Sequence, residues 1–243
     1  MWLIVFDNDI PEPWELGFHD AGCLAMEEII FFHDEIMYFV VLITILVLWG
    51  IIRALISGYY HKYLFEGVLI EVIWTLLPAV VLIFLAFPSL KLLYLMDDVI
   101  SPGLTIKIVG HQWYWFYEYS DYGPETIEFD SYLIPTSSLN EGEQRLLDVD
   151  NRMKAPVHTE VRLLVTGEDV LHSFAVTSLS IKVDAVPGRL NQASFMIKRE
   201  GLFYGQCSEI CGANHSFMPI VVEGVSLSNF ISWVENYNPP ETI

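Results

Sequence analysis

The sequence predicts an α-helical hairpin in a membrane near the N-terminus, followed by an all-β domain. Two runs of the 243-residue chain, 36–52 and 72–90, contain no charged residue. From about residue 103 the pattern changes to short alternating segments separated by Gly and Pro. Long apolar runs are typical of membrane helices, and short alternating runs with turn residues are typical of strands.

Each uncharged run approaches the length of a membrane-spanning helix, which needs about 20 apolar residues. The runs reach that length if Arg53 and Lys91 extend their charged ends to the membrane surface. Two buried core helices are the alternative. The absence of charged residues from both runs argues against this alternative. Pro78 and Pro88 also argue against it, because proline is better tolerated in membrane helices than in soluble ones.

The distribution of charge predicts the orientation of this hairpin. Residues 1–35 contain nine acidic residues and no Lys or Arg, whereas the loop 53–71 carries Arg53 and Lys62. Because basic loops stay on the inner side, we expect this loop to be inside. The predicted parts are an acidic outer segment, 1–35, a hairpin, 36–95, and an outer domain, 96–243.

The outer domain is predicted from short strands and one helix. Strands are expected at 104–109, 161–166, 193–198 and 219–223, and a short helix at 226–234. Roughly 120 residues of short strands predict a β-sandwich or a barrel.

A loop rich in metal ligands dominates the second half of the chain. Cys207, Cys211, His215 and Met218 lie within twelve residues, and His172 lies upstream. Thiolate and thioether are soft ligands that suit copper, and a weak Met ligand is typical of copper rather than zinc. The alternatives are a structural zinc site, a disulfide, and a one-copper blue site, which needs only one thiolate.

Several further segments resemble one known family. They are Gly110-His-Gln-Trp-Tyr-Trp-Phe-Tyr-Glu-Tyr119, Phe129-Asp-Ser-Tyr-Leu-Ile-Pro-Thr136, Asp169-Val-Leu-His172 and Val186-Pro-Gly-Arg-Leu-Asn191. Together with the metal loop, they resemble the cytochrome c oxidase subunit II family. The resemblance implies a cupredoxin-like Greek-key barrel that holds a dinuclear copper centre, CuA.

The same resemblance implies an electron-entry subunit of a haem-copper oxidase. Electrons would pass from cytochrome c to the copper centre and then to haem in subunit I, where oxygen reduction is coupled to proton pumping. The oxygen-reducing site therefore belongs to another subunit. The implied copper ligands are His172, Cys207, the backbone carbonyl of Glu209, Cys211, His215 and Met218.

A second metal is implied beside the copper. The side chain of Glu209 would bind a Mg or Mn ion shared with subunit I, with Asp184 in its outer shell, because a carboxylate suits such a hard ion. A solvent-facing loop glutamate is the alternative interpretation.

Two residues are implied in electron and proton transfer. Trp113 would receive the electron at the surface above the copper, whereas Trp115 would point to the other side of a strand. Glu71 would lie at the entrance of a proton path into subunit I, although a membrane-edge carboxylate is often only an anchor. Leu69 replaces an acid that many relatives carry, so proton uptake would depend more on Glu71.

The net charge of −19 argues against a nucleic-acid partner and favours a basic protein partner. Simple solubility is the alternative explanation of the charge. After Lys91 there are twenty acidic residues against nine Lys and Arg, so the outer domain carries about −11. The resemblance identifies the basic partner as cytochrome c. The candidate docking acids are Glu118, Asp121, Asp130, Asp150 and Asp169.

The other expected partners are oxidase subunits I and III, accessory subunits and membrane lipid. The expected location is the mitochondrial inner membrane, as a multi-pass protein with both termini in the intermembrane space. This choice over a bacterial membrane rests on the compact chain.

Four rival functions remain in view. A quinol-oxidising subunit II would lack the copper ligands that this chain carries. A copper-delivery protein would not need Trp113 or Glu71, and a nitrous oxide reductase domain would not explain the hairpin. A zinc-stabilised membrane interaction domain is separable by metal analysis.

Overall fold

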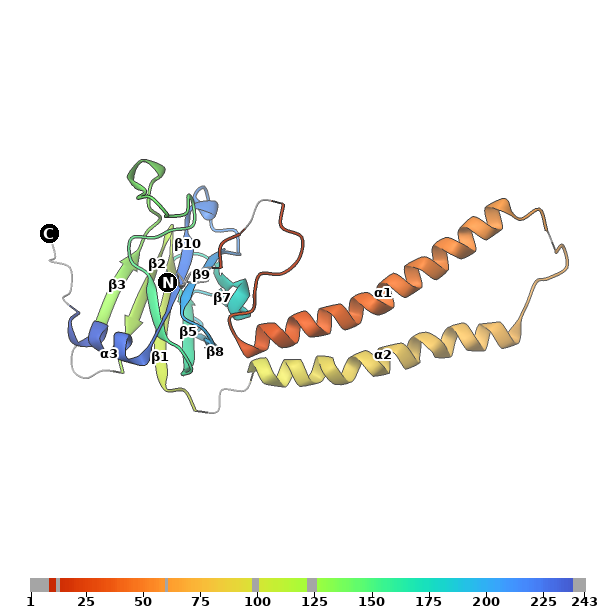
Figure 1. Ribbon diagram of the computed structural model, residues 1–243, viewed down its shortest axis with the longest axis horizontal. Helices are drawn as coiled ribbons and strands as arrows, with labels where there is room; N and C mark the ends of the chain where they lie inside the picture. The colour runs from red at the N-terminus through yellow and green to blue at the C-terminus, as the bar shows by residue number, and fades with distance from the viewer. Residues whose placement is uncertain (1–8, 12–13, 60, 98–100, 122–125, 238–243) are drawn as a thin grey trace, which may run out of the picture. The chain divides into compact units, whose positions relative to one another are not determined.

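A computed structural model describes residues 9–11, 14–59, 61–97, 101–121 and 126–237. The chain divides into two compact units (Figure 1). One unit is Glu28–Leu95, and the other contains Met1–Glu27 together with Met96–Ile243. The two units are treated separately below.

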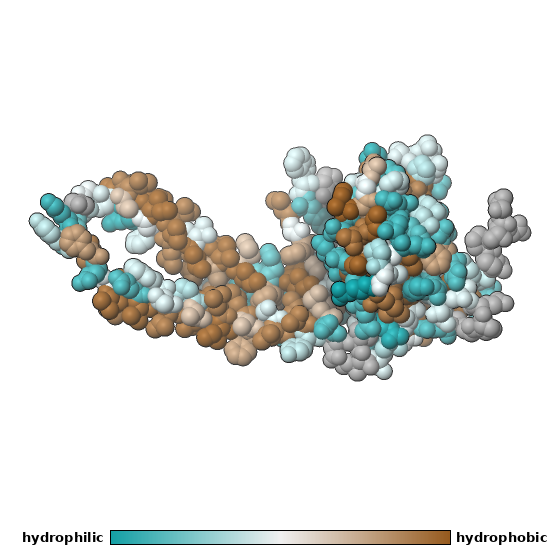
Figure 2. Space-filling model, turned by 180° about the vertical axis from the view of Figure 1, so that it is seen from behind, coloured by the Kyte–Doolittle hydropathy of each residue, from teal (hydrophilic) through white to brown (hydrophobic). Residues whose placement is uncertain are grey.

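The unit Glu28–Leu95 is built from two long helices. Helix α1 spans Leu24–Ile56 and α2 spans Val68–Asp97, so each contains one of the predicted uncharged runs. Both are long and apolar enough to cross a membrane, and Figure 2 shows their surface as largely hydrophobic. The Lys91 ammonium lies 2.9 Å from the Glu28 carboxylate and links the end of α2 to α1. The two predicted helices are confirmed.

The β-domain consists of two five-stranded sheets (Figure 1). The first has the order β3-β2-β1-β5-β8, with bounds Ile127–Ser131, Tyr114–Tyr119, Leu104–His111, Glu160–Gly167 and Asn191–Met196. The second has the order β4-β10-β9-β6-β7, with bounds Met153–Pro156, Pro219–Val225, Gly201–Cys207, His172–Val176 and Ile181–Ala185. The four predicted strands correspond to β1, β5, β8 and β10.

Short helical turns and one helix complete the domain. The 3-10 turns η1, η2 and η3 span Thr136–Ser138, Thr177–Leu179 and His215–Phe217. Helix α3, Leu227–Glu235, begins after Ser226, whose hydroxyl accepts a hydrogen bond from the backbone N–H of Asn229. This N-cap supplies a partner for an otherwise unpaired donor of the first turn, as expected for the predicted terminal helix.

The core is formed by side chains that alternate along the strands. Burial alternates along β2, and along β1 except at Val109, which is the period of a strand with one face against a core. The largest fully buried side chains of the strands include Ile106, Ile108, Trp115, Tyr117, Leu163, Phe174 and Phe203. Removing such aromatic and branched groups from water is the main stabilising contribution to this sandwich.

The pairing of β6 with β9 brings two predicted ligands to one end of the second sheet. Phe174 pairs with Cys207, and Ala175 pairs with Gln206, so His172 at the start of β6 lies near the end of β9. Gly205 makes this pairing possible, because an added Cβ would lie 2.1 Å from the carbonyl oxygen of Ala175.

We therefore expect Gly205→Ala to destabilise the domain by about 1–3 kcal/mol, because the added methyl group forces β6 and β9 apart. Thermal unfolding of the detergent-solubilised chain measures the change. Gly58→Ala is the matched control, since nothing lies within 4 Å of its added Cβ. Equal melting temperatures for the two variants would contradict the assigned role of Gly205.

Candidate metal centre

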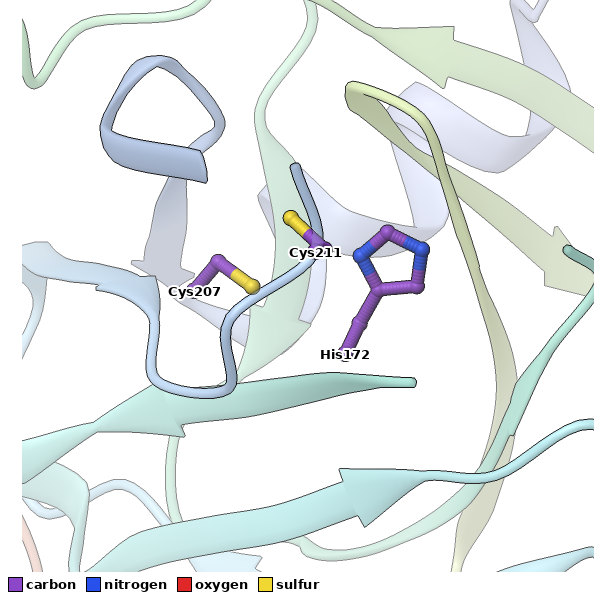
Figure 3. Close-up of side chains that lie close together, drawn as sticks. All are labelled: His172, Cys207 and Cys211. Atoms are coloured by element: carbon purple, nitrogen blue, oxygen red, sulfur yellow. The ribbon is translucent and has the colours of Figure 1, made fainter. Parts of the chain in front are cut away.

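Three potential ligands converge in the interior of the β-domain. The metal-binding atoms of His172, Cys207 and Cys211 all lie within 4.8 Å of one another. Figure 3 shows both sulfur atoms on one side of the imidazole ring of His172. The three side chains are almost fully buried, with 0%, 7% and 4% of their surface exposed. Two thiols and an imidazole therefore face one enclosed space.

The remaining predicted ligands border the same space. The Sδ atom of Met218 lies 3.4 Å from Cys211 Sγ, and Nδ1 of His215 lies 3.6 Å from the same sulfur. The Cys207 thiol donates to the backbone carbonyl of Glu209 at 3.4 Å. All six ligands inferred from the sequence are thus brought together.

The local backbone explains this convergence. Strand β9 ends at Cys207 and β10 begins at Pro219, so the residues between them form the connecting loop. The Ser208 N–H donates to the carbonyl of Ser173 at 3.0 Å, which anchors the start of this loop beside β6. Gly110 leaves space for the imidazole, because an added Cβ would lie 2.9 Å from the ring of His172.

The two nitrogens of His172 have different surroundings. Nε2 lies 2.8 Å from a carboxylate oxygen of Asp169, whereas the buried Nδ1 has no hydrogen-bond partner among the described residues. A neutral imidazole that donates from Nε2 carries its lone pair on Nδ1. This lone pair points toward the two thiols and is available to bind a metal ion together with them.

The pKa values of Cys207, Cys211 and His172 are shifted in different directions. Burial favours the neutral thiol of Cys207, but the His172 ring and nearby backbone N–H groups outweigh burial and lower its pKa. Burial and the negative charge of Cys207 raise the pKa of Cys211. Burial lowers the pKa of His172, but Cys207 and Asp169 raise it overall. Adjacent thiols resist carrying two negative charges, and a cation between them removes that penalty.

The donor set fits a soft metal such as copper. Cys207 and Cys211 are free thiols in the structure and form no disulfide with each other. The orphaned imidazole nitrogen and the thioether of Met218 face the thiols, as a soft-metal site requires. The group His172, Cys207 and Cys211 is compatible with a CuA site.

Trp113 lies against the metal loop. It stands in the turn between β1 and β2 and is half-buried. A Cβ on Gly212 would lie 3.2 Å from its indole ring, so the tryptophan rests on the loop backbone where φ is +126°. Trp115 is fully buried, and its indole N–H donates to the carbonyl of Met218 at 3.3 Å. The opposite orientation of these two tryptophans stays a prediction.

The five candidate docking acids separate into two groups. Tyr114, next to Trp113, has its pKa raised by burial and by the negative charges of Asp130, Glu168 and Asp169. The hydroxyl of Tyr132 donates to Asp130 at 3.3 Å. Asp150 accepts the backbone N–H of Tyr132, whose ring stacks on Tyr114 at 4.6 Å.

The other two acids lie away from Trp113. Glu118 is near the far end of β2 and is paired with Lys107 at 2.6 Å. Asp121 accepts the backbone N–H of Thr105, at the opposite end of β1 from Trp113.

The residues predicted for the second metal and the proton path have simple surroundings. Glu209 is half-buried and Asp184 is exposed. Among the described residues, neither belongs to a group of three clustered metal ligands. Glu71 lies in the first turn of α2 and accepts the backbone N–H of Gly67, so it caps this helix. The magnesium site and the proton entrance therefore stay predictions.

Sequence reasoning missed two contributors to the site. The side chain of Gln112 donates to the carbonyl of Cys211 at 2.7 Å and ties the Trp113 turn to the metal loop. Asp169 contacts His172, although the sequence suggested only a docking charge. The three-residue spacing from a ligand histidine was the available signal for Asp169, and the hydrogen bond of Gln112 has no such signal.

Comparisons with known proteins match both units. The family described as "Cytochrome C oxidase subunit II, periplasmic domain" matches residues 104–225, and the family described as its transmembrane domain matches residues 11–92. "Cytochrome c oxidase subunit 2" from Metridium senile is 64% identical over 235 residues, covering 96% of this chain and 95% of the relative. The same subunit from Mycosarcoma maydis is 52% identical over 238 residues, covering 94% and 93%.

A solved structure is also similar. It is the crystal structure of the periplasmic domain of subunit II of cytochrome oxidase from Bradyrhizobium japonicum. The two sequences are 48% identical and the TM-score is 0.52, with 57% of this chain and 95% of that chain covered.

Proposed function

Because this chain belongs to the cytochrome c oxidase subunit II family, we propose that it is the electron-entry subunit of the oxidase. It is a membrane-anchored subunit of that oxidoreductase, with two apolar helices and a cupredoxin-like domain. In the proposed function it accepts electrons from cytochrome c and passes them to haem in subunit I, where oxygen reduction is coupled to proton pumping. The convergence of His172, Cys207 and Cys211 is the observation that carries this proposal.

Six groups would hold a dinuclear copper centre. They are the side chains of His172, Cys207, Cys211, His215 and Met218, and the carbonyl oxygen of Glu209. Bound copper supplies a one-electron carrier in which the charge, and hence the change in bond lengths, is shared over two metals. The chain's own contribution is to keep these donors buried and fixed, so that little rearrangement accompanies electron transfer.

Trp113 is proposed as the point where the electron enters. Its ring lies on Gly212, one residue after the ligand Cys211, and the side chain is half-buried and thus partly accessible. Trp115 is excluded from this role because it is fully buried.

The partner would dock around Trp113. Asp130 and Asp150 provide negative charge there, and the stacked rings of Tyr114 and Tyr132 add apolar surface, with 43% of Tyr132 exposed. Complementary charge orients a basic partner and raises its association rate, which suits a short-lived redox complex.

The remaining roles are proposed from the family resemblance. Glu209, with Asp184 nearby in the outer shell, would bind a Mg or Mn ion shared with subunit I. Glu71 would admit protons toward subunit I, in addition to its cap on α2. The chain would lie in the mitochondrial inner membrane beside subunits I and III and the accessory subunits, with both termini in the intermembrane space.

The copper centre is tested by loading the full chain with copper in detergent and recording its electron paramagnetic resonance spectrum after oxidation. We expect two copper ions per chain and hyperfine splitting from one electron shared by both nuclei. A single-copper spectrum would instead indicate a blue-copper carrier, and a chain that takes up only zinc would return the thiols to a structural role. Cys207→Ser is expected to abolish the shared signal.

Replacing Trp113 with Leu should slow electron entry from cytochrome c while two coppers remain bound, because the indole contacts the loop backbone and is not one of the proposed copper ligands. We expect the rate in the assembled oxidase to fall about tenfold or more, equivalent to a barrier higher by about 1.4 kcal/mol. Trp233→Leu, on α3, is the control and should leave this rate unchanged. Loss of copper in Trp113→Leu, or an unaltered rate, would refute the entry role.

Because the candidate docking acids lie at different distances from Trp113, we expect their substitutions to weaken cytochrome c docking to different degrees. Asp130→Asn should raise KM for cytochrome c by about two- to fivefold, as expected for a surface charge interaction worth about 0.4–1 kcal/mol. Asp121→Asn should have a smaller effect because it is far from Trp113 along the sheet. Steady-state kinetics at several salt concentrations measures both, since salt weakens such attraction. A KM independent of salt would rule out docking by charge.

A further inference from the structure

One carboxylate connects a copper ligand to the turn that carries Trp113. The Oδ1 atom of Asp169 lies 2.8 Å from His172 Nε2 and accepts the backbone N–H of Val170 at 2.6 Å. Its Oδ2 atom accepts the backbone N–H of Gln112 at 2.7 Å. Both oxygens are therefore engaged within the chain.

A second hydrogen bond closes this connection. The side chain of Gln112 donates to the carbonyl of Cys211 at 2.7 Å. The links run from His172 through Asp169 and Gln112 to Cys211, which shares the buried site with His172. Trp113, the residue after Gln112, lies on Gly212, so two successive residues of the turn contact the metal loop.

Asp169 also fixes the proton of its ligand histidine. An acceptor at Nε2 keeps that nitrogen protonated and leaves the lone pair on Nδ1, which has no hydrogen-bond partner among the described residues. A carboxylate behind a metal-bound histidine also makes the imidazole a stronger electron donor.

The neighbouring acid provides a contrast. The Glu168 side chain is 70% exposed and lies 3.5 Å from His111. The Asp169 side chain is 33% exposed. Two adjacent residues thus carry the same charge, but only one of them is bonded to a copper ligand.

We infer that Asp169 is a positioning residue that orients His172 and the Trp113 turn together, whatever charge it adds to the docking surface. This inference rests on the proposed function and deepens it. It concerns how the chain tunes the copper ligand and the entry residue at the same time.

Substitutions separate positioning from docking. Asp169→Asn removes the charge and leaves one acceptor oxygen for three N–H groups, so the set of hydrogen bonds that joins His172 to the Trp113 turn cannot be kept intact. Asp169→Glu keeps the charge but moves the carboxylate by one methylene. Glu168→Gln is the matched control, because it removes the same charge one residue away without touching His172.

The assembled oxidase carrying each variant is measured in four ways. They are the reduction potential of the copper centre, copper retention against a chelator, the electron-entry rate, and KM for cytochrome c at several salt concentrations. For Asp169→Asn we expect a higher potential, because a weaker imidazole donor stabilises oxidised copper less. We also expect copper retention to fall about 10- to 100-fold and electron entry to slow.

The other two variants distinguish the causes. Asp169→Glu should shift the potential while KM keeps its salt dependence, and Glu168→Gln should leave potential and retention unchanged. The inference is overturned if Asp169→Asn changes only KM and its salt dependence, as Glu168→Gln does, or if Asp169→Glu matches the parent chain in potential and retention.

The metal-free chain gives a readout that does not depend on copper. Nitrogen-15 NMR of His172 should report the Nε2–H tautomer in the parent chain and in Glu168→Gln, and a changed tautomer ratio in Asp169→Asn. If this result holds but no dinuclear copper spectrum is found, the proposed function fails while Asp169 keeps its positioning role. If the copper spectrum is present and both Asp169 variants leave potential and tautomer unaltered, only the positioning role fails.

Discussion

The site depends on the burial of two thiols beside an imidazole. Removing these groups from water makes a second negative charge costly, and the opposite pKa shifts of Cys207 and Cys211 express that cost. A bound cation is the simplest way to stabilise both thiolates at once. Metal binding would then release protons and stabilise the loop, since ligands must be deprotonated to bind.

Much of the β-domain serves to place that loop. The close pairing of β6 and β9 beside Gly205 brings His172 to the end of β9. The loop from β9 to β10 carries the other ligands to the same end. The first sheet contributes a turn that lies on the loop and a tryptophan, Trp115, whose indole donates to the carbonyl of Met218. Both sheets therefore restrain the ligands, which limits their movement when the charge of the site changes.

The sequence predicted the parts of this structure that repeat or cluster along the chain. Uncharged runs indicated α1 and α2, alternation indicated β1 and β5, and the spacing of Cys207, Cys211, His215 and Met218 indicated one site. Contacts between distant segments left no such pattern. The Glu209 carbonyl is a backbone group present in every residue, and the bond from Gln112 to Cys211 joins positions that only the folded sheets bring together. For the same reason sequence could not separate Asp121 from Asp130, which lie toward opposite ends of the first sheet.

The loop backbone at Gly212 has a consequence for the distance over which an electron would tunnel. Tunnelling weakens exponentially with the gap between donor and acceptor, and a gap across van der Waals contact is more costly than one along bonds. In the proposed role of Trp113, the absence of a side chain at Gly212 lets the indole rest directly on the peptide next to Cys211. Any larger residue would act as a spacer, so the smallest amino acid in the loop would also set the electronic coupling of the whole entry route.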